Sequence, residues 1–212
     1  LPTITVPAGR YNNMGWVADA WGARVDIKVG TTSHQHAAAA IRYLSDPLQR
    51  HIFTHTGWRQ VSGAWHFLHG AGAIAASGFV SDVEVELGRG LRDYQLPDPQ
   101  SGDIKHAIQA SLALLGVAPD PVTWPLLAAV FRSVLAEWLP AELSIFVVGP
   151  TGTFKTCLAA LCAAHFGQGW TGSNPPASWS STPNALERMA FTTKDHLFLI
   201  DDFAPNGTTW TS

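Results

Sequence analysis

The spacing of apolar residues predicts that helices and short strands alternate along this chain. Helical spacing is found over residues 11–21, 33–45, 103–115, 124–139, 155–166 and 182–190. Alternating or continuous apolar runs that are typical of strands cover residues 24–29, 51–55, 58–61, 64–68, 83–87, 143–148 and 196–200. Ser62 and Gly63 lie between two of these runs and predict a hairpin turn. The pattern therefore predicts an α/β protein.

Proline residues divide this pattern into three parts. Pro97 and Pro99 lie in a short polar stretch between the last N-terminal strand and the first long helix. We therefore expect a mixed, β-rich accessory domain over residues 1–97 and a helical connector over residues 98–142. Residues 143–212 then follow the order strand, loop, helix, strand. The chain lacks an initial Met and ends at Ser212 soon after the last strand, so we expect a fragment of a longer protein.

Composition narrows the class of protein. Of the 212 residues 46% are apolar and 14% are charged, which favours a folded core over disorder. The longest apolar stretches are far shorter than the ~20 residues that a membrane-spanning helix needs, so no membrane partner is expected. The net charge of −3 lacks the basic excess of a dedicated nucleic-acid module. Cys157 and Cys162 point to different sides of one predicted helix, which favours unpaired thiols and a cytoplasmic location.

Residues 149–156 read Gly-Pro-Thr-Gly-Thr-Phe-Lys-Thr, a pattern typical of a phosphate-binding P-loop. The motif follows a predicted buried strand and opens a predicted helix, whose N-terminal N–H groups attract an anion. We expect Lys155 to reach the β- and γ-phosphates and Thr156 to bind Mg²⁺. The expected nucleotide-binding residues are Gly149, Pro150, Thr151, Gly152, Thr153, Phe154, Lys155 and Thr156.

One residue departs from the usual P-loop pattern. Phe154 stands where glycine normally precedes the lysine, at a position that often adopts a conformation disfavoured by a bulky side chain. A chance loop between a strand and a helix is the alternative interpretation of the motif.

A second motif complements the predicted P-loop. Residues 197–202 are four apolar residues followed by Asp201 and Asp202, as in a Walker B strand. We expect Asp201 to hold Mg²⁺ through water and to meet Thr156 across the metal. Asp202 is the candidate base that polarises the attacking water, although glutamate is commoner there. Alone, such a run is more often a strand that enters a turn. Together the motifs predict ATP and Mg²⁺ as cofactors, with Lys155 and Asp202 as catalytic residues.

Other polar and aromatic residues have simpler interpretations. Thr182 is expected to cap a helix, and this is favoured over a phosphate contact from Asn184 or Glu187. The nine histidines show no ligand spacing typical of a structural zinc site. The tryptophans could stack on nucleic-acid bases, but such aromatic residues are more often part of a core.

Several stretches resemble a group of bacterial, phage and plasmid P-loop proteins of undefined function that are associated with primase and helicase modules. Besides the P-loop, the matching stretches are residues 14–16, 21–22, 55–59, 69–74, 94–97, 178–187 and 201–205. The resemblance implies that Phe154 is normal in the loop. It also implies a partial P-loop NTPase sheet of the ASCE (RecA-like) type with flanking helices, behind a β-rich region.

The resemblance implies an ATPase motor that acts on single-stranded or duplex DNA in a mobile element, with a homo-oligomer of the full-length protein as one possible assembly that the sequence does not decide. Such cores normally continue with a sensor strand and an arginine finger, so we expect this fragment alone to bind ATP weakly and to hydrolyse it poorly. Two other classes stay open. One is a P-loop kinase or phosphotransferase, and the other is a scaffold that binds nucleotide without hydrolysing it.

Overall fold

A computed structural model describes residues 4–28, 30–44, 51–80, 83–98, 102–140 and 142–203. Contacts within the chain divide it into two compact units, Leu1–Arg50 and His51–Ser212. Both the predicted P-loop and the predicted Walker B segment belong to the second unit. The predicted boundaries at residues 97/98 and 142/143 stay predictions.

The first unit is helical in its described part. It contains the 3-10 helix η1 (Ala8–Asn13), α1 (Gly15–Trp21), the 3-10 helix η2 (Gly22–Arg24) and α2 (Ser33–Leu44). The helix predicted over residues 33–45 is found as α2, whereas the helix predicted over 11–21 is interrupted at Met14, which has φ of 55°. Gly22 ends α1 by donating its N–H to the carbonyl of Ala18. Trp16, Val17 and Ala38 are buried in a small core between the helices.

The strand predicted over residues 24–29 is wrong for residues 25–28, which form no strand. A strand needs a neighbour to accept its hydrogen bonds, and the described residues of this unit form helices and loops alone. Val29 and Ser45 lie outside the described residues.

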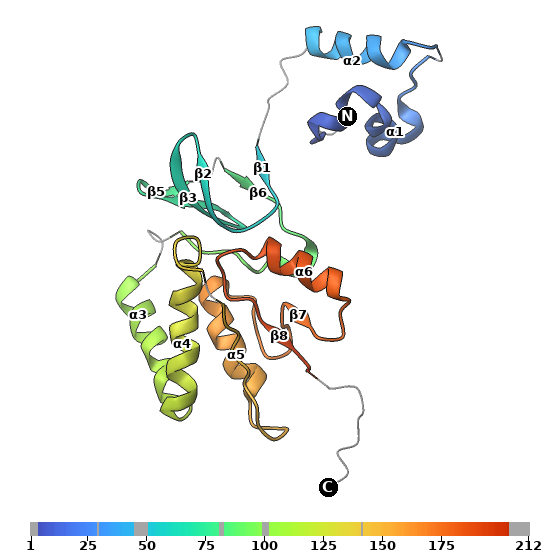
Figure 1. The fold of residues 1–212 in the computed structure, drawn as a ribbon. Coiled ribbons are helices and arrows are strands. Elements are labelled where there is room, and N and C mark those ends of the chain that lie inside the picture. The colour runs from blue at the N-terminus through green and yellow to red at the C-terminus, as the bar shows by residue number, and fades with distance from the viewer. Residues whose placement is uncertain are drawn as a thin grey trace, which may run out of the picture. The chain divides into compact units, whose positions relative to one another are not determined.

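The second unit begins with short strands (Figure 1). Strands β2 (Gly57–Val61), β3 (Ala64–His69), β4 (Gly72–Ala75) and β5 (Gly78–Val80) form an antiparallel sheet in chain order, while β1 (Ile52–Phe53) pairs in parallel with β6 (Glu84–Val85). The predicted hairpin turn is confirmed, because Ser62 and Gly63 have φ of 51° and 83° and join β2 to β3. The sequence pattern missed β4 and β5, which are four and three residues long and each begin with glycine, a residue of low strand propensity.

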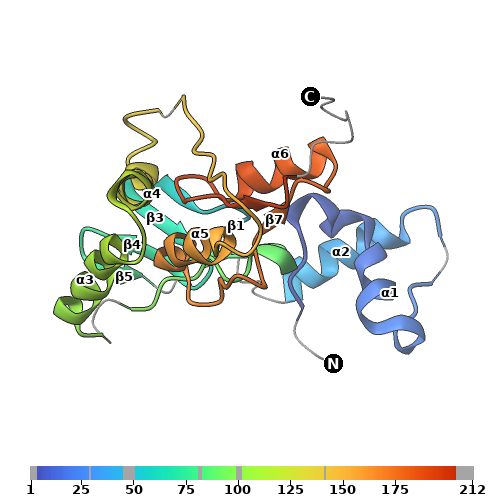
Figure 2. The ribbon, with the colours of Figure 1, turned by 90° about the horizontal axis from the view of Figure 1, so that it is seen from below.

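Three helices of this unit, α3 (Ile104–Ala113), α4 (Asp120–Val134) and α5 (Lys155–Ala163), lie side by side in Figures 1 and 2. The 3-10 helix η5 (Leu114–Gly116) follows α3, and η6 (Ala164–Phe166) follows α5. The prediction for 124–139 misplaced α4, and Pro125 lies inside the helix. Pro121 already occupies the first turn, where the missing N–H costs nothing.

The core of the second unit joins these helices to the loop after η3 (Arg89–Leu91). Its buried members include Tyr94, Leu127, Val130 and Phe166. Tyr94 is fully buried, and burial raises the pKa of its hydroxyl. That hydroxyl donates a 2.9 Å hydrogen bond to the carbonyl of Leu197, which connects the core to the segment before the last strand.

The remaining elements are β7 (Ala177–Ser178), α6 (Pro183–Thr192) and β8 (Ile200–Asp201). β7 and β8 form a two-stranded parallel sheet. The strand predicted over residues 196–200 is therefore much shorter than expected. β7 arises within residues 168–181, where the sequence predicts only a loop.

The buried strand predicted over residues 143–148 is wrong. Leu143, Phe146 and Val148 are 72%, 64% and 89% exposed. Figure 2 shows this segment as an extended trace leading from α4 to α5. A strand requires a hydrogen-bonded neighbour, and the described residues provide none beside this segment. The described chain is thus a mixed α/β protein with an antiparallel sheet, and its described part contains no P-loop NTPase sheet.

Candidate functional site

The main-chain carbonyls of the predicted phosphate-binding loop contact the side chain of the loop's own lysine. Lys155 is the first residue of α5, and its Nζ donates to the carbonyl oxygens of Gly149 at 2.9 Å and Pro150 at 2.7 Å. Thr153 closes the same turn, because its hydroxyl donates to the Pro150 carbonyl at 2.8 Å. The loop therefore places an ammonium group close to its own main chain, at the N-terminus of α5.

The backbone conformation of Phe154 shows how the loop accommodates a residue other than glycine at this position. Phe154 has φ of 57° and ψ of 25°, which is the left-handed region expected for this position of the motif. Its side chain is 77% exposed and does not pack in the core. Gly152 also has positive φ, at 84°. The chain thus adopts a left-handed backbone at this position with phenylalanine in place of glycine.

The N-terminus of α5 lacks a side-chain cap. Phe154 occupies the N-cap position, and its apolar side chain accepts no hydrogen bond from the first turn. The first N–H groups of a helix have no partner within the helix and carry the positive end of the helix dipole. An anion bound beside Lys155 would satisfy these donors.

The two predicted motifs meet in the structure. The Thr156 hydroxyl donates a 3.1 Å hydrogen bond to Oδ1 of Asp201, although the two residues belong to different elements. Asp201 ends β8, and its carbonyl accepts from the N–H of Trp179 at 2.9 Å. The parallel pairing of β7 and β8 therefore holds the carboxylate that faces the beginning of α5.

Asp202, the predicted base, is placed differently from Asp201. It is exposed, and its backbone has φ of 59°. Of the two acids, Asp201 is the one that contacts the helix of the predicted loop. The prediction that Asp202 acts as a base stays a prediction.

Sequence reasoning missed the contacts that hold β8 in place. Asp195 is 7% exposed and accepts a 2.8 Å hydrogen bond from the N–H of Trp58. Thr56, which is fully buried, donates its hydroxyl to the carbonyl of Lys194 at 2.9 Å and its N–H to that of Thr192. These contacts fasten the start of β2 to the turn between α6 and β8. The sequence offers only an Asp within a short polar run, residues 192–196, as a signal of these contacts.

Two buried histidines lie in the same region. Burial lowers the pKa of His69 to about 4, and its Nδ1 faces the N–H groups of Ala71 and Leu96. Burial also lowers the pKa of His196 to about 4, and the ring lies between Phe67 and Phe166 at 4.9 Å and 4.8 Å between ring centroids. Both imidazoles are therefore neutral packing groups at neutral pH.

The segment around Thr182 forms the helix cap that the sequence predicts. Thr182 is the N-cap of α6, and its hydroxyl accepts from the N–H of Ala185 at 3.3 Å. Asn184 and Glu187 are exposed on the helix. The capping prediction is confirmed.

The residues present fit a magnesium ion that keeps most of its water. Mg²⁺ prefers oxygen ligands and is usually bound through one or two protein groups. Thr156 and Asp201 supply one hydroxyl and one carboxylate at the same place. Among the described residues, no group of three or more His, Cys, Asp or Glu side chains could hold a metal ion.

Both cysteines are free, as predicted. Cys157 is exposed and Cys162 is buried, and burial raises the pKa of the Cys162 thiol to about 11. In the described part of the chain, no helix is long and apolar enough to cross a membrane.

Comparison with known proteins adds no family to this picture. No family model matches the chain, and the searches of curated proteins and of solved structures give no significant match.

Proposed function

We propose that this chain binds a nucleoside triphosphate, with ATP and Mg²⁺ as the natural pair, at residues 149–156 and Asp201. The observation that carries the proposal is the 3.1 Å hydrogen bond between Thr156 and Asp201. Two motifs that the sequence ties to one metal ion lie within hydrogen-bond distance of each other. A chance loop before a helix has no reason to lie against a distant Asp-Asp segment.

Each residue has a role that follows from its chemistry. The Lys155 ammonium, now held by two loop carbonyls, would exchange them for β- and γ-phosphate oxygens. The uncapped N–H groups of α5 would bind the same phosphates. Thr156 and Asp201 would hold the magnesium ion, which neutralises phosphate charge when it is bound.

The proposal extends to ATP hydrolysis and to DNA as the partner of the protein. We propose that the full-length protein is an ATPase motor on DNA, in which Asp202 orients the attacking water. Its support is the order of the motifs and the resemblance to proteins associated with primase and helicase modules. The scaffold alternative draws support from the exposure of Asp202 and from Phe154.

Nucleotide binding is tested with a fluorescent ATP analogue and the purified chain. Lys155→Ala is expected to weaken binding by about tenfold or more, since it removes the charge that meets two phosphates. Asp201→Asn is expected to abolish the Mg²⁺ dependence of binding. Lys105→Ala is the matched control, because Lys105 is exposed on α3. Equal affinity in Lys155→Ala and Lys105→Ala would contradict the proposal.

Turnover by the full-length protein separates the three classes. ATP hydrolysis that single-stranded DNA stimulates, and that Lys155→Ala and Asp202→Asn abolish, supports the motor. Phosphate transfer to a small acceptor without DNA supports a kinase. Binding that survives Asp202→Asn, with no turnover in either form, supports the scaffold.

A further inference from the structure

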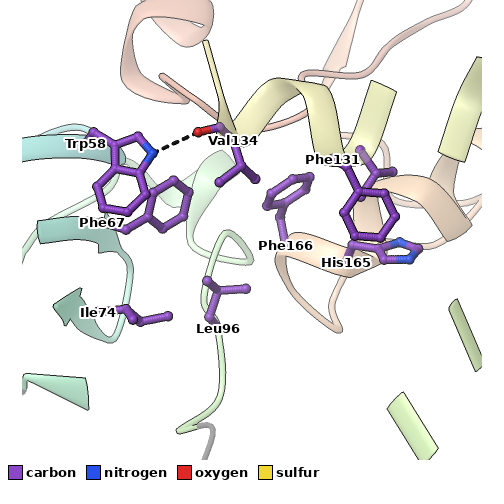
Figure 3. A pocket seen from close by; sticks show the side chains of 9 residues that line it. Trp58, Phe67, Ile74, Leu96, Phe131, Val134, His165 and Phe166 are labelled. Carbon is purple, nitrogen blue, oxygen red and sulfur yellow. Dashed lines mark hydrogen bonds between the residues drawn. The ribbon is translucent and has the colours of Figure 1, made fainter. Parts of the chain in front are cut away.

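The second unit contains an apolar cavity away from the candidate nucleotide site. Its volume is about 350 Å³. Figure 3 shows Trp58, Phe67 and Ile74, from β2, β3 and β4, facing Phe131, Val134 and Phe166 from α4 and η6. The cavity thus lies between the antiparallel sheet and the helices of one compact unit.

The side chains that form the walls of the cavity are held by contacts with one another and with His196. The indole N–H of Trp58 donates a 2.8 Å hydrogen bond to the carbonyl of Val134, which joins the sheet wall to the helix wall. Phe67 packs edge-on against Trp58 at 5.1 Å between ring centroids and lies against His196 on another side. Phe166 also contacts His196. These contacts fix the positions of the side chains that form the walls.

The polar groups at the cavity are already engaged. Nδ1 of His165 lies 3.1 Å from the carbonyls of Leu161 and Cys162, so it is the nitrogen that donates. Its Nε2 then accepts from the Ser111 hydroxyl at 2.8 Å. The Trp58 N–H is also satisfied. The lining contains no charged side chain.

We propose that this cavity is a binding site for a small, uncharged aromatic molecule. Ring faces, ring edges and methyl groups are what the walls offer, and these favour a flat apolar ligand over a charged or strongly hydrogen-bonding one. The volume lies at the lower end of the usual range for ligand pockets, which suits a ligand of about two or three rings. The proposal does not depend on nucleotide binding.

The probe for the test is N-phenyl-1-naphthylamine, an uncharged dye that fluoresces in apolar surroundings. We expect saturable binding of one dye molecule per chain. Ile74→Trp fills the cavity and is expected to weaken this binding by about tenfold or more. Ile104→Trp is the matched control, since Ile104 is 63% exposed on α3 and does not line the cavity. It should leave the affinity unchanged.

A second measurement keeps the test independent of how well one variant folds. Naphthalene added to the unaltered chain should shift the nuclear magnetic resonance signal of the Trp58 indole N–H, assigned with Trp58→Phe. Non-saturable dye binding, equal weakening in Ile74→Trp and Ile104→Trp, or an unmoved Trp58 signal would overturn the proposal. Any of these results would place the dye on exposed apolar surface.

Discussion

Phe154 shows what a single residue contributes to the candidate site. A left-handed backbone costs a non-glycine residue about 1–2 kcal/mol, yet Phe154 adopts it with φ of 57°. The loop geometry therefore prevails over the preference of the residue. A side chain that is 77% exposed recovers little of this cost through burial.

Two substitutions test this interpretation. Phe154→Gly is expected to keep nucleotide affinity, because glycine adopts positive φ freely. Phe154→Val is expected to weaken it several-fold, because a β-branched residue tolerates this backbone poorly. Titration with a fluorescent ATP analogue measures both. Weaker binding by the glycine variant than by the valine variant would show that the phenylalanine ring itself contributes to binding.

The buried histidines make stability depend on pH. His69 and His196 have pKa values of about 4 in the folded chain and about 6.5 when unfolded, so the unfolded state takes up protons first as the pH falls. The contribution of these two neutral histidines to the free energy of unfolding is fully present above about pH 6.5. It is lost progressively as the pH falls from 6.5 to 4. The loss is on the order of 3 kcal/mol for each histidine.

Urea unfolding between pH 7.5 and pH 4.5 measures this loss. His69→Gln should flatten the curve, because the amide oxygen can accept from the same N–H groups without titrating. His106→Gln, at an exposed histidine of α3, is the control and should follow the original curve. Parallel curves for all three proteins would contradict the assignment to His69.

At the scale of elements, the turn before β8 is a tertiary junction. Asp195 accepts the N–H of Trp58 and lies 3.4 Å from Nζ of Lys194, with φ of 58°. Lys194 in turn pairs with Glu137 after α4. Asp195 and Lys194 together therefore connect β2, the segment after α4 and the approach to β8.

Loss of this carboxylate is expected to loosen the whole junction. Asp195→Ala should lower the free energy of unfolding by about 2–3 kcal/mol, the usual contribution of a buried hydrogen bond to a charged group. Asp195→Asn keeps an acceptor and tolerates positive φ, so its effect should be smaller. Urea denaturation measures both, with the exposed Glu187→Ala as control. An equal loss in the Asn and Ala variants would point to charge alone.

At the scale of the molecule, the chain consists of two compact units. All contacts that build the candidate nucleotide site come from residues 51–203. A chain that begins at His51 is therefore expected to bind nucleotide within about twofold of the 212-residue chain. Titration of both proteins with the same analogue checks this. A loss of about tenfold or more would show that the first unit contributes to the site.

Local patterns predicted much of this architecture. Helical spacing located α2, α3, α5 and α6, and the turn residues located the β2–β3 hairpin. The motif residues Lys155, Thr156 and Asp201 were identified from local sequence, since phosphate and magnesium impose short-range rules on residue type. These features depend on neighbours in the chain, so a sequence displays them.

Residues far apart in the chain decided the rest. The apolar run at 143–148 is exposed because no described strand pairs with it, and no local pattern reports a missing neighbour. β7 pairs with β8 across 22 residues between Ser178 and Asp201, and its own two residues predict nothing.

The sequence by itself determined the candidate phosphate chemistry, the cap of α6 and the turn between β2 and β3, because capping, turns and phosphate contacts act over a few residues. The tertiary structure alone gave the direct hydrogen bond between Thr156 and Asp201, which the motifs predicted only across a metal ion. It also decided that Asp195 joins β2 to the approach of β8 and that an apolar cavity lies between sheet and helices. Such contacts arise from packing between distant segments, whose geometry a linear pattern does not contain.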